Sequence, residues 1–363
     1  MALSCGIVGL PNVGKSTIFS ALTAAQAERG NYPFCTIEPN VAVVDVPDAN
    51  LARLRKHIDS EKIIPASCRI VDIAGLIEGA SRGEGMGNQF LANIRECDAI
   101  MQVVRCFEST VVLREGAVDP AKDMELIETE LMLADLQTLE KARDRSGRAA
   151  KSGDKDAILF DLVVNRAVEA LNAGRVPRSL DWKPPEREAL KPLCLMTMKP
   201  MLYVANVADD DCAGTSAHAR SVAARAVASG AEWLPICGDM ECELGSLEVA
   251  ERVAFMEQLG MAEPGLDRLV RSVYKLLGLQ TYYTAGPKEI RAWTVSCEAT
   301  APQAAGVIHT DFEKGFIRAQ IYSVTDLEEL GDEAAVKAAG RLRTEGRDYR
   351  MRTGDVCHFL FNR

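Results

Sequence analysis

Short apolar stretches alternate with longer stretches of helical periodicity through most of the 363-residue chain. Each apolar stretch is long enough for one strand of a sheet that is covered on both faces, because such strands bury short continuous runs. The stretches are Cys5–Val8, Val41–Val46, Cys68–Ile73, Ala99–Val104, Met201–Asn206 and Leu234–Cys237. Strands that alternate with helices predict an α/β fold with a mostly parallel sheet.

A long helical segment interrupts this alternation. Apolar residues recur at helical spacing over Met124–Ala134 and again over Leu159–Leu171. The stretch between them, 141–155, holds six basic and two acidic residues. We therefore expect an antiparallel helical hairpin with a basic tip, although an ordinary solvated helix end has the same composition. The candidate RNA contacts at this tip are Arg143, Arg145, Arg148 and Lys151.

The pattern changes again after Gly278, where strands dominate. The expected strands are Lys288–Val295, Phe316–Ile321 and Asp355–Phe361, and the expected helix is Ala304–Lys314. A β-rich segment of this length fits a small separate domain. Within it, Arg341–Arg352 carries five arginines and an interleaved tyrosine, which makes it a second candidate for RNA contact.

The segment Gly9–Thr17 fits the pattern G-x-x-x-x-G-K-[ST], directly after the first predicted strand and before a helical pattern. In such a P-loop, backbone N–H groups surround the phosphates and the helix N-terminus adds positive potential. The sequence therefore predicts that the chain binds a nucleoside triphosphate. The expected contacts at the phosphates are Asn12, Val13, Gly14, Lys15, Ser16 and Thr17.

Two further motifs point to Mg²⁺ and the γ-phosphate. Asp72–Gly75 follows a strand and matches D-x-x-G, so the Asp72 carboxylate is expected in the Mg²⁺ shell and the Gly75 N–H near the γ-phosphate. The Ser16 hydroxyl is expected to be a Mg²⁺ ligand, and Thr36 is placed to supply a second one when the triphosphate is bound.

Two departures from the usual GTPase pattern affect the water and the base. Leu76 follows the D-x-x-G motif, where many GTPases carry a glutamine that orients the attacking water. Asn206-Val207-Ala208-Asp209 stands where a GTPase carries N-K-x-D. Asp209 keeps the carboxylate that accepts hydrogen bonds from guanine, but Val207 removes the lysine. The residues alone leave ATP and GTP both open.

Taken together, Gly9–Thr17, Asn31–Asn40, Asp72–Gly87 and Ile308–Phe316 closely resemble the YchF subfamily of Obg-like ATPases, and the resemblance covers essentially the whole chain. It implies a translation-factor-class G domain with a helical insertion and a C-terminal TGS domain of β-grasp fold. It also implies ATP hydrolysis, often in preference to GTP, and association with ribosomes. The expected division is a G-type domain over 1–120 and 200–277, the insertion over 121–199, and the TGS-like domain over 278–363.

The chain departs from this family in two places. Relatives usually end the base-reading motif with glutamate, whereas this chain has Asp209, which leaves dual ATP and GTP specificity open. Relatives usually offer a histidine in the loop after the Asp98–Phe107 region, and this chain has none there. Arg114 offers a cation instead, or is an ordinary solvated arginine. Leu76 fits the resemblance, because relatives replace the glutamine with a hydrophobic residue.

A monovalent cation is our hypothesis for the missing charge stabilisation at the phosphoryl group. Asn12 is spaced to ligate K⁺ between the phosphates or to serve only as a turn residue, and the resemblance favours K⁺. The expected catalytic set is therefore Lys15, Asn12, Gly75 and Leu76, with Mg²⁺ and K⁺ as cofactors.

Composition narrows the class of protein. The net charge is −10, so RNA contact requires local basic patches. Most of the 11 cysteines sit in apolar settings without a C-x-x-C pair, which is typical of a reduced cytoplasmic protein, and no apolar run reaches the ~20 residues that span a bilayer. A metabolic P-loop kinase and a non-hydrolysing RNA-binding module remain as alternatives to a nucleotide-hydrolysing switch.

Overall fold

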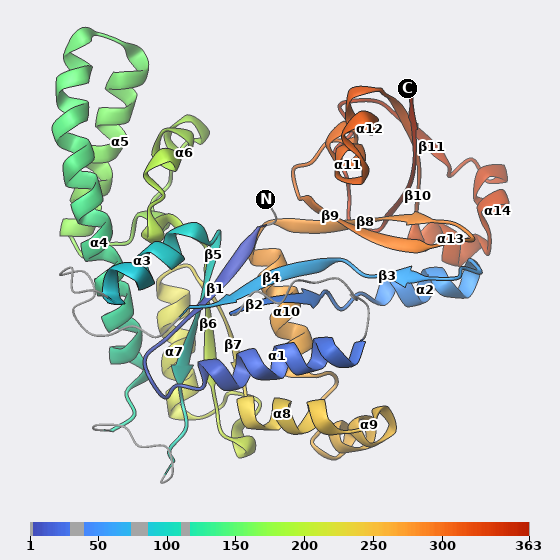
Figure 1. Ribbon diagram of the computed structural model, residues 1–363, viewed down its shortest axis with the longest axis horizontal. Coiled ribbons are helices and arrows are strands. Elements are labelled where there is room, and N and C mark those ends of the chain that lie inside the picture. The colour runs from blue at the N-terminus through green and yellow to red at the C-terminus, as the bar shows by residue number, and fades with distance from the viewer. Residues whose placement is uncertain (1–2, 30–39, 74–85, 110–116, 363) are drawn as a thin grey trace. The chain divides into compact units, whose positions relative to one another are not determined.

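The chain contains two six-stranded sheets and divides into two compact units (Figure 1). The computed structural model describes residues 3–29, 40–73, 86–109 and 117–362. One unit comprises Met1–Ala25, Thr36–Ala42 and Arg69–Leu269, and the other comprises Gln26–Cys35, Val43–Cys68 and Val270–Arg363. No helix within the described ranges combines the length and the apolar character needed to cross a bilayer.

The first sheet confirms the predicted α/β architecture. Its strand order is β2-β4-β1-β5-β6-β7, and β1 pairs in parallel with both β4 and β5, as do β5 with β6 and β6 with β7. The strands are β1 (Ser4–Val8), β2 (Val41–Asp45), β4 (Ser67–Asp72), β5 (Ala99–Arg105), β6 (Met201–Asn206) and β7 (Glu232–Ile236). All six lie within two residues of the predicted bounds. The central strands β5 and β6 are buried throughout, which explains their continuous apolar runs.

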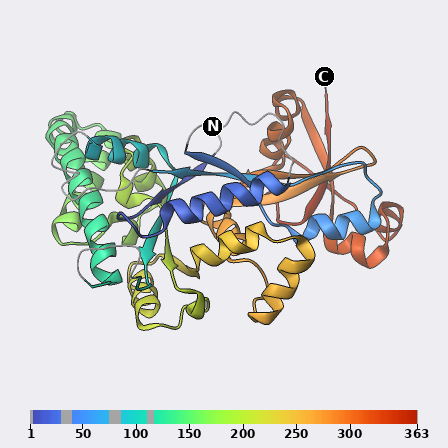
Figure 2. The ribbon, with the colours of Figure 1, turned by 60° about the horizontal axis from the view of Figure 1, so that its bottom comes forward.

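Helices cover this sheet, and residues of α3, α4, α7 and α8 pack with its strands into one hydrophobic cluster. Figure 2 shows α1 lying across the strands. The helices are α1 (Lys15–Arg29), α3 (Met86–Glu96), α4 (Pro120–Ala149), α5 (Lys155–Asn172), α6 (Pro184–Leu190), α7 (Ala217–Ala228), α8 (Gly238–Ser246), α9 (Val249–Gln258) and α10 (Gly265–Leu276).

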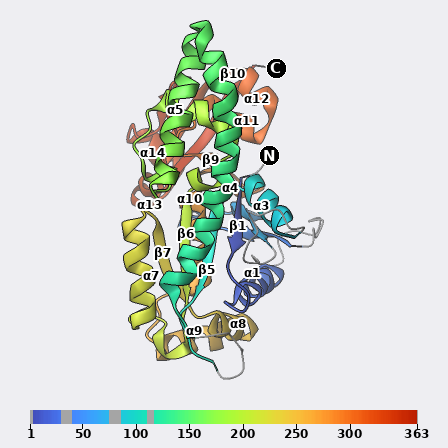
Figure 3. The same ribbon diagram turned by 90° about the vertical axis from the view of Figure 1, so that its left-hand side faces the viewer.

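The predicted helical hairpin is formed by α4 and α5, which run side by side in Figures 1 and 3. Asp119 caps α4 by accepting a hydrogen bond from the Lys122 N–H at 3.2 Å, and Asp154 caps α5 in the same way. Small and β-branched residues, among them Ala142, Val163 and Ala167, are buried along the seam between the helices. The first half of α4 belongs to the core of the sheet, so the hairpin begins in that core.

The second sheet has the order β11-β10-β12-β8-β9-β3 and is mixed. Its strands are β3 (Ile63–Ile64), β8 (Leu279–Ala285), β9 (Ile290–Ser296), β10 (Phe316–Ser323), β11 (Arg343–Glu345) and β12 (Asp355–Phe361). Its helices are α2 (Ala49–His57), α11 (Ala301–Ile308), α12 (Thr310–Lys314), α13 (Val324–Leu330) and α14 (Glu333–Ala338). The single helix expected over Ala304–Lys314 is instead two helices, because His309 takes an extended conformation and its side chain accepts from the Asp311 N–H.

The segment 43–68 groups with the C-terminal unit, whereas the sequence placed it in the nucleotide-binding domain. β3 pairs in parallel with β9, and the Tyr283 hydroxyl donates to the Asp48 Oδ2 at 2.6 Å. Leu51 and Leu54 of α2 are buried in this arrangement. Such pairings join residues more than 200 positions apart, which local patterning does not reveal. The remaining domain bounds stay a prediction.

Candidate nucleotide-binding site

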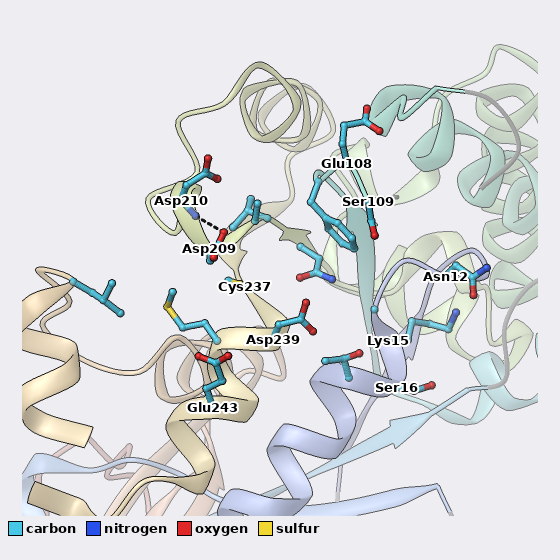
Figure 4. Close-up of a pocket in the computed structure, with 18 of the residues that line it drawn as sticks. Asn12, Lys15, Ser16, Glu108, Ser109, Asp209, Asp210, Cys237, Asp239 and Glu243 are labelled. Atoms are coloured by element: carbon cyan, nitrogen blue, oxygen red, sulfur yellow. Dashed lines mark hydrogen bonds between the residues drawn. The ribbon is translucent and has the colours of Figure 1, made fainter. Parts of the chain in front are cut away.

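A cavity of about 770 Å³ lies at the carboxyl ends of β1, β5, β6 and β7 (Figure 4). Ligands of open α/β sheets bind at this edge, where loops from neighbouring strands converge. Eight of the residues predicted to bind nucleotide line the cavity. They are Asn12, Gly14, Lys15, Ser16, Thr17, Asn206, Val207 and Asp209.

The loop between β1 and α1 requires glycine at Gly14. The φ angle of Gly14 is 93°, in the region that side chains rarely adopt, and an added Cβ would overlap the Asn206 Nδ2. Gly14 also begins α1, since its carbonyl accepts from the Ile18 N–H at 3.0 Å. The loop therefore leads directly into the helix N-terminus, as a phosphate site needs.

Asn206, the last residue of β6, hydrogen-bonds the backbone of the P-loop. Its side chain is 4% exposed, its Nδ2 donates to the Val13 carbonyl at 2.9 Å, and its Oδ1 accepts from the Gly238 N–H at 3.1 Å. The first bond turns the Val13 carbonyl toward β6, so the trans peptide points the Gly14 N–H the opposite way. Asn206 thus ties the P-loop to the loops after β6 and β7.

Lys15 folds back onto its own loop. Its Nζ donates to the carbonyls of Gly9 and Leu10 at 2.8 Å each. Burial lowers the pKa of Lys15, and the negative charge of Asp72 opposes that change. Burial likewise raises the pKa of Asp72 at the end of β4, with the Lys15 charge opposing it. A bound phosphate offers Lys15 charged acceptors in place of the two carbonyls.

The opposite end of the cavity is acidic. The exposed Asp209 carboxylate accepts from the Asp210 N–H at 3.0 Å, so one of its oxygens is engaged within its own turn. Val207 is 2% exposed and belongs to the sheet core. The facing wall comes from α8 and α9 and was not identified from the sequence. It consists of Cys237, Asp239, Met240, Glu243, Phe255 and Leu259.

The described donors suit Mg²⁺. Ser16 offers a hydroxyl in the cavity and Asp72 a half-buried carboxylate beside Lys15. Mg²⁺ is usually bound by one or two such oxygens together with phosphates and waters, so a cage of protein carboxylates is not required. Among the described residues there is no group of three or more His, Cys, Asp and Glu side chains able to hold a metal. Thr36, Gly75, Leu76 and Arg114 lie outside the described residues.

The sequence also missed the wall that follows β5. Phe107, Glu108 and Ser109 line the cavity, and Arg105 lies behind them with only 2% of its surface exposed. A signal was present in the sequence, because a charged residue ends an otherwise nearly apolar strand.

The two basic segments differ in their internal pairing. The side chains of Arg143, Arg145, Arg148 and Lys151 are exposed around the end of α4. Those of Arg341–Arg352 are largely engaged within the protein. Arg341 pairs with Asp326 and Glu329, Arg343 with Glu345 and Asp355, and Arg350 with Glu298. The hairpin tip therefore presents the less compensated positive charge.

The fold and the phosphate loop define a P-loop nucleotide-binding protein of the GTPase class. Residues 4–135 match the profile of a family described as 50S ribosome-binding GTPase, and residues 279–362 match that of the C-terminal domain of YchF GTPases, described as a protein of unknown function. The chain belongs to the YchF family.

Full-length relatives place the whole chain in this family. It is 50% identical to a protein of Escherichia coli O157:H7 and 47% identical to one of Bacillus subtilis (strain 168), over 100% of each chain, and both are named Ribosome-binding ATPase YchF. The solved structure of the Schizosaccharomyces pombe YchF GTPase is 34% identical and superposes with a TM-score of 0.90, covering 99% of this chain and 97% of that one.

Proposed function

We propose that this protein is a ribosome-associated ATPase that hydrolyses ATP to ADP and phosphate and uses the bound nucleotide as a conformational switch. The observation that carries the proposal is the cavity lined by Gly14, Lys15 and Asn206, in which Asn206 holds the backbone of the P-loop. The full-length identity to proteins named Ribosome-binding ATPase YchF supports the choice of ATP and of the ribosome.

At the phosphate end, Lys15 binds the β- and γ-phosphates and the N–H groups of Asn12–Thr17 surround them. Ser16, Thr36 and Asp72 hold the Mg²⁺, which neutralises charge on the phosphates when it is bound. Gly75 supplies a backbone N–H to the γ-phosphate, since a glycine lets the backbone approach closely. Thr36 and the Asp72–Leu76 segment are ordered by the triphosphate and released after hydrolysis.

Leu76 cannot orient a water molecule by hydrogen bonding, so another group stabilises the charge that develops on the transferred phosphoryl group. Asn12 would hold K⁺ in the cavity, and the cation would supply the positive charge that stabilises the transferred group. In support, Asn12 lines the cavity and has a φ of 60°, a left-handed conformation that asparagine tolerates better than most residues.

The base end of the cavity offers the carboxylates of Asp209, Asp239 and Glu243. A carboxylate accepts hydrogen bonds from the exocyclic amine of adenine and equally from the N1–H and amine of guanine, so these charges alone do not choose the base. Asp209, which would read guanine, has one oxygen engaged by the Asp210 N–H. Together with the full-length identity to proteins named Ribosome-binding ATPase YchF, this supports ATP binding at least as tight as that of GTP.

The basic tip of the hairpin, Arg143, Arg145, Arg148 and Lys151, contacts ribosomal RNA through its phosphates. Its exposed side chains and its position at the end of the two-helix arm support this assignment. Arg341–Arg352 is a weaker contact, because three of its five arginines already pair with carboxylates. A ribosomal partner assigns the protein to the cytoplasm.

Phosphate release from ATP in the absence of any acceptor tests the proposed activity. We expect steady release that depends on Mg²⁺ and is lost in Lys15→Ala, which removes the phosphate-binding charge. A kinase would require an acceptor, and an RNA-binding module would release nothing. Failure of the purified wild-type protein to release phosphate, with or without ribosomes, would reject the ATPase.

A further inference from the structure

Arg105, the last residue of β5, is among the largest fully buried side chains of the described structure, with 2% of its surface exposed. An arginine does not lose its proton in a protein, so β5 carries a permanent positive charge to the edge of the sheet where the cavity opens. Nothing in the proposed chemistry uses this charge.

The guanidinium joins two segments that both line the cavity. Its Nη1 donates to the Asn12 carbonyl at 3.3 Å, and its Nε donates to the Phe107 carbonyl at 3.1 Å. Its Cζ also lies 4.5 Å from the centre of the Phe107 ring, within the range of a cation–π contact. Figure 4 shows Asn12 and Ser109, from these two segments, at the same cavity.

The bond to Asn12 fixes one peptide plane of the P-loop. Because the peptide is trans, a carbonyl of Asn12 turned toward β5 points the N–H of Val13 away from β5. Asn206 acts in the same way on the next peptide through the Val13 carbonyl. Two buried side chains thus hold consecutive carbonyls behind the loop and leave consecutive N–H groups pointing to the opposite side.

We propose that Arg105 is a positioning residue for nucleotide binding, which presets the P-loop amides and couples them to the wall formed by Phe107–Ser109. It acts through Asn12 and Phe107 and does not touch the reacting atoms. The planar guanidinium of Arg105 holds Asn12 in place before the triphosphate binds. This matters because the left-handed backbone conformation of Asn12 costs conformational energy. The proposal rests on the proposed function only in taking the ligand to be a nucleoside triphosphate.

Arg105→Lys is the informative variant, because it keeps the charge but replaces the rigid fork with a flexible ammonium that does not span both carbonyls. We expect the Kd for ATPγS to rise about tenfold, the loss of roughly one charge-assisted hydrogen bond, with kcat per folded molecule within about threefold of wild type. Preset amides bind substrate and transition state alike, so KM rises while kcat holds.

Val104→Ala is the matched control. Val104 precedes Arg105 in β5, is fully buried in the sheet core, and does not line the cavity. This variant loses stability, which lowers only the active fraction, so kcat falls and KM and Kd stay at wild-type values. If Arg105→Lys behaves like Val104→Ala, or leaves the Kd unchanged, the positioning role is wrong.

Direct titration with ATPγS needs no hydrolysis, so it separates this inference from the proposed ATPase. Binding that weakens in Arg105→Lys supports the inference even if the wild type releases no phosphate. If Arg105→Lys does not fold, Arg105→Gln, which keeps a donor and most of the volume, is judged by the same Kd and KM criteria.

Discussion

Asp72 and Lys15 show at the scale of single residues how binding competence opposes stability. Burial disfavours the charged form of each, and the attraction between them offsets that only in part. A half-buried carboxylate is costly in the free protein, but it is the ligand that a hard divalent cation needs. The site therefore holds two charges that are only partly compensated within the protein.

Asp72→Asn is predicted to raise the Tm of the nucleotide-free protein at pH 7 while weakening Mg²⁺-dependent nucleotide binding. The folded pKa of Asp72 is raised above its ordinary value of 3.8, so the folded state holds the proton to higher pH than the unfolded state. The stabilisation that protonated Asp72 gives the folded state is thus lost as pH rises from 3.8 through the higher folded pKa.

Thermal denaturation across pH checks this expectation. The difference in Tm between variant and wild type should be smallest below pH 3.8 and should grow toward neutrality. Asp348→Asn, at an exposed position, serves as the control. If Asp72→Asn is less stable than wild type at pH 7, the Asp72 carboxylate stabilises the folded protein and the prediction is wrong.

Asn12→Ala is predicted to remove stimulation by K⁺. Wild-type turnover should be several-fold faster in KCl than in NaCl at equal ionic strength, because only the larger cation is ligated productively by Asn12 and the phosphates. The variant should be equally slow in both salts. Equal rates of wild-type ATP turnover in KCl and NaCl would contradict the K⁺ hypothesis and leave Asn12 as a turn residue.

At the scale of elements, a buried carboxylate of α4 holds the segment that returns from the helical insertion to the sheet. Asp135 of α4 is fully buried and accepts from the N–H groups of Met196 and Thr197, at 3.1 and 2.7 Å, and from the Thr197 hydroxyl. These bonds anchor the chain that returns from the insertion just before β6 begins at Met201.

Asp135→Ala should destabilise the protein by about 3 kcal/mol, because it leaves two buried N–H groups without an acceptor. Denaturant unfolding measures this loss. Asp144→Ala, at an exposed position on the same helix, should change the unfolding free energy by less than about 0.5 kcal/mol. Comparable stability of the two variants would show that the anchor contributes little.

Charge reversal at the hairpin tip is predicted to weaken co-sedimentation with ribosomes. Changing Arg143, Arg145 and Arg148 to glutamate replaces attraction to RNA phosphates with repulsion, so the Kd should rise at least tenfold and salt dependence should diminish. The matched control reverses three exposed charges elsewhere: Lys122, Lys191 and Arg220. Unchanged binding by the tip variant would remove the tip from the interface.

The elements that sequence patterning predicted well are those with local causes. The six strands of the first sheet were predicted within two residues, because each is a continuous apolar run in a doubly covered sheet. The P-loop was recognisable because its chemistry lies within nine residues. The roles of Arg105 and of segment 43–68 depend on contacts 93 or more residues away along the chain, which periodicity does not encode.

At the scale of the whole molecule, the chain combines a sheet whose edge carries the candidate nucleotide-binding cavity, a two-helix arm that begins in the core of that sheet, and a C-terminal sheet unit. α3 shares its hydrophobic cluster with the base of the arm, and Arg95 of α3 donates to the Thr138 hydroxyl of α4 at 3.0 Å. α3 and the base of the arm are therefore packed as one core.

Competitive binding of ATP and GTP to the wild-type protein tests the assignment as an ATPase. We expect ATP to displace a fluorescent nucleotide at concentrations no higher than GTP requires, because one oxygen of Asp209, the carboxylate that would read guanine, is engaged by the Asp210 N–H. Asp209→Glu should leave that order unchanged. A preference for GTP of tenfold or more would contradict the assignment of the protein as an ATPase.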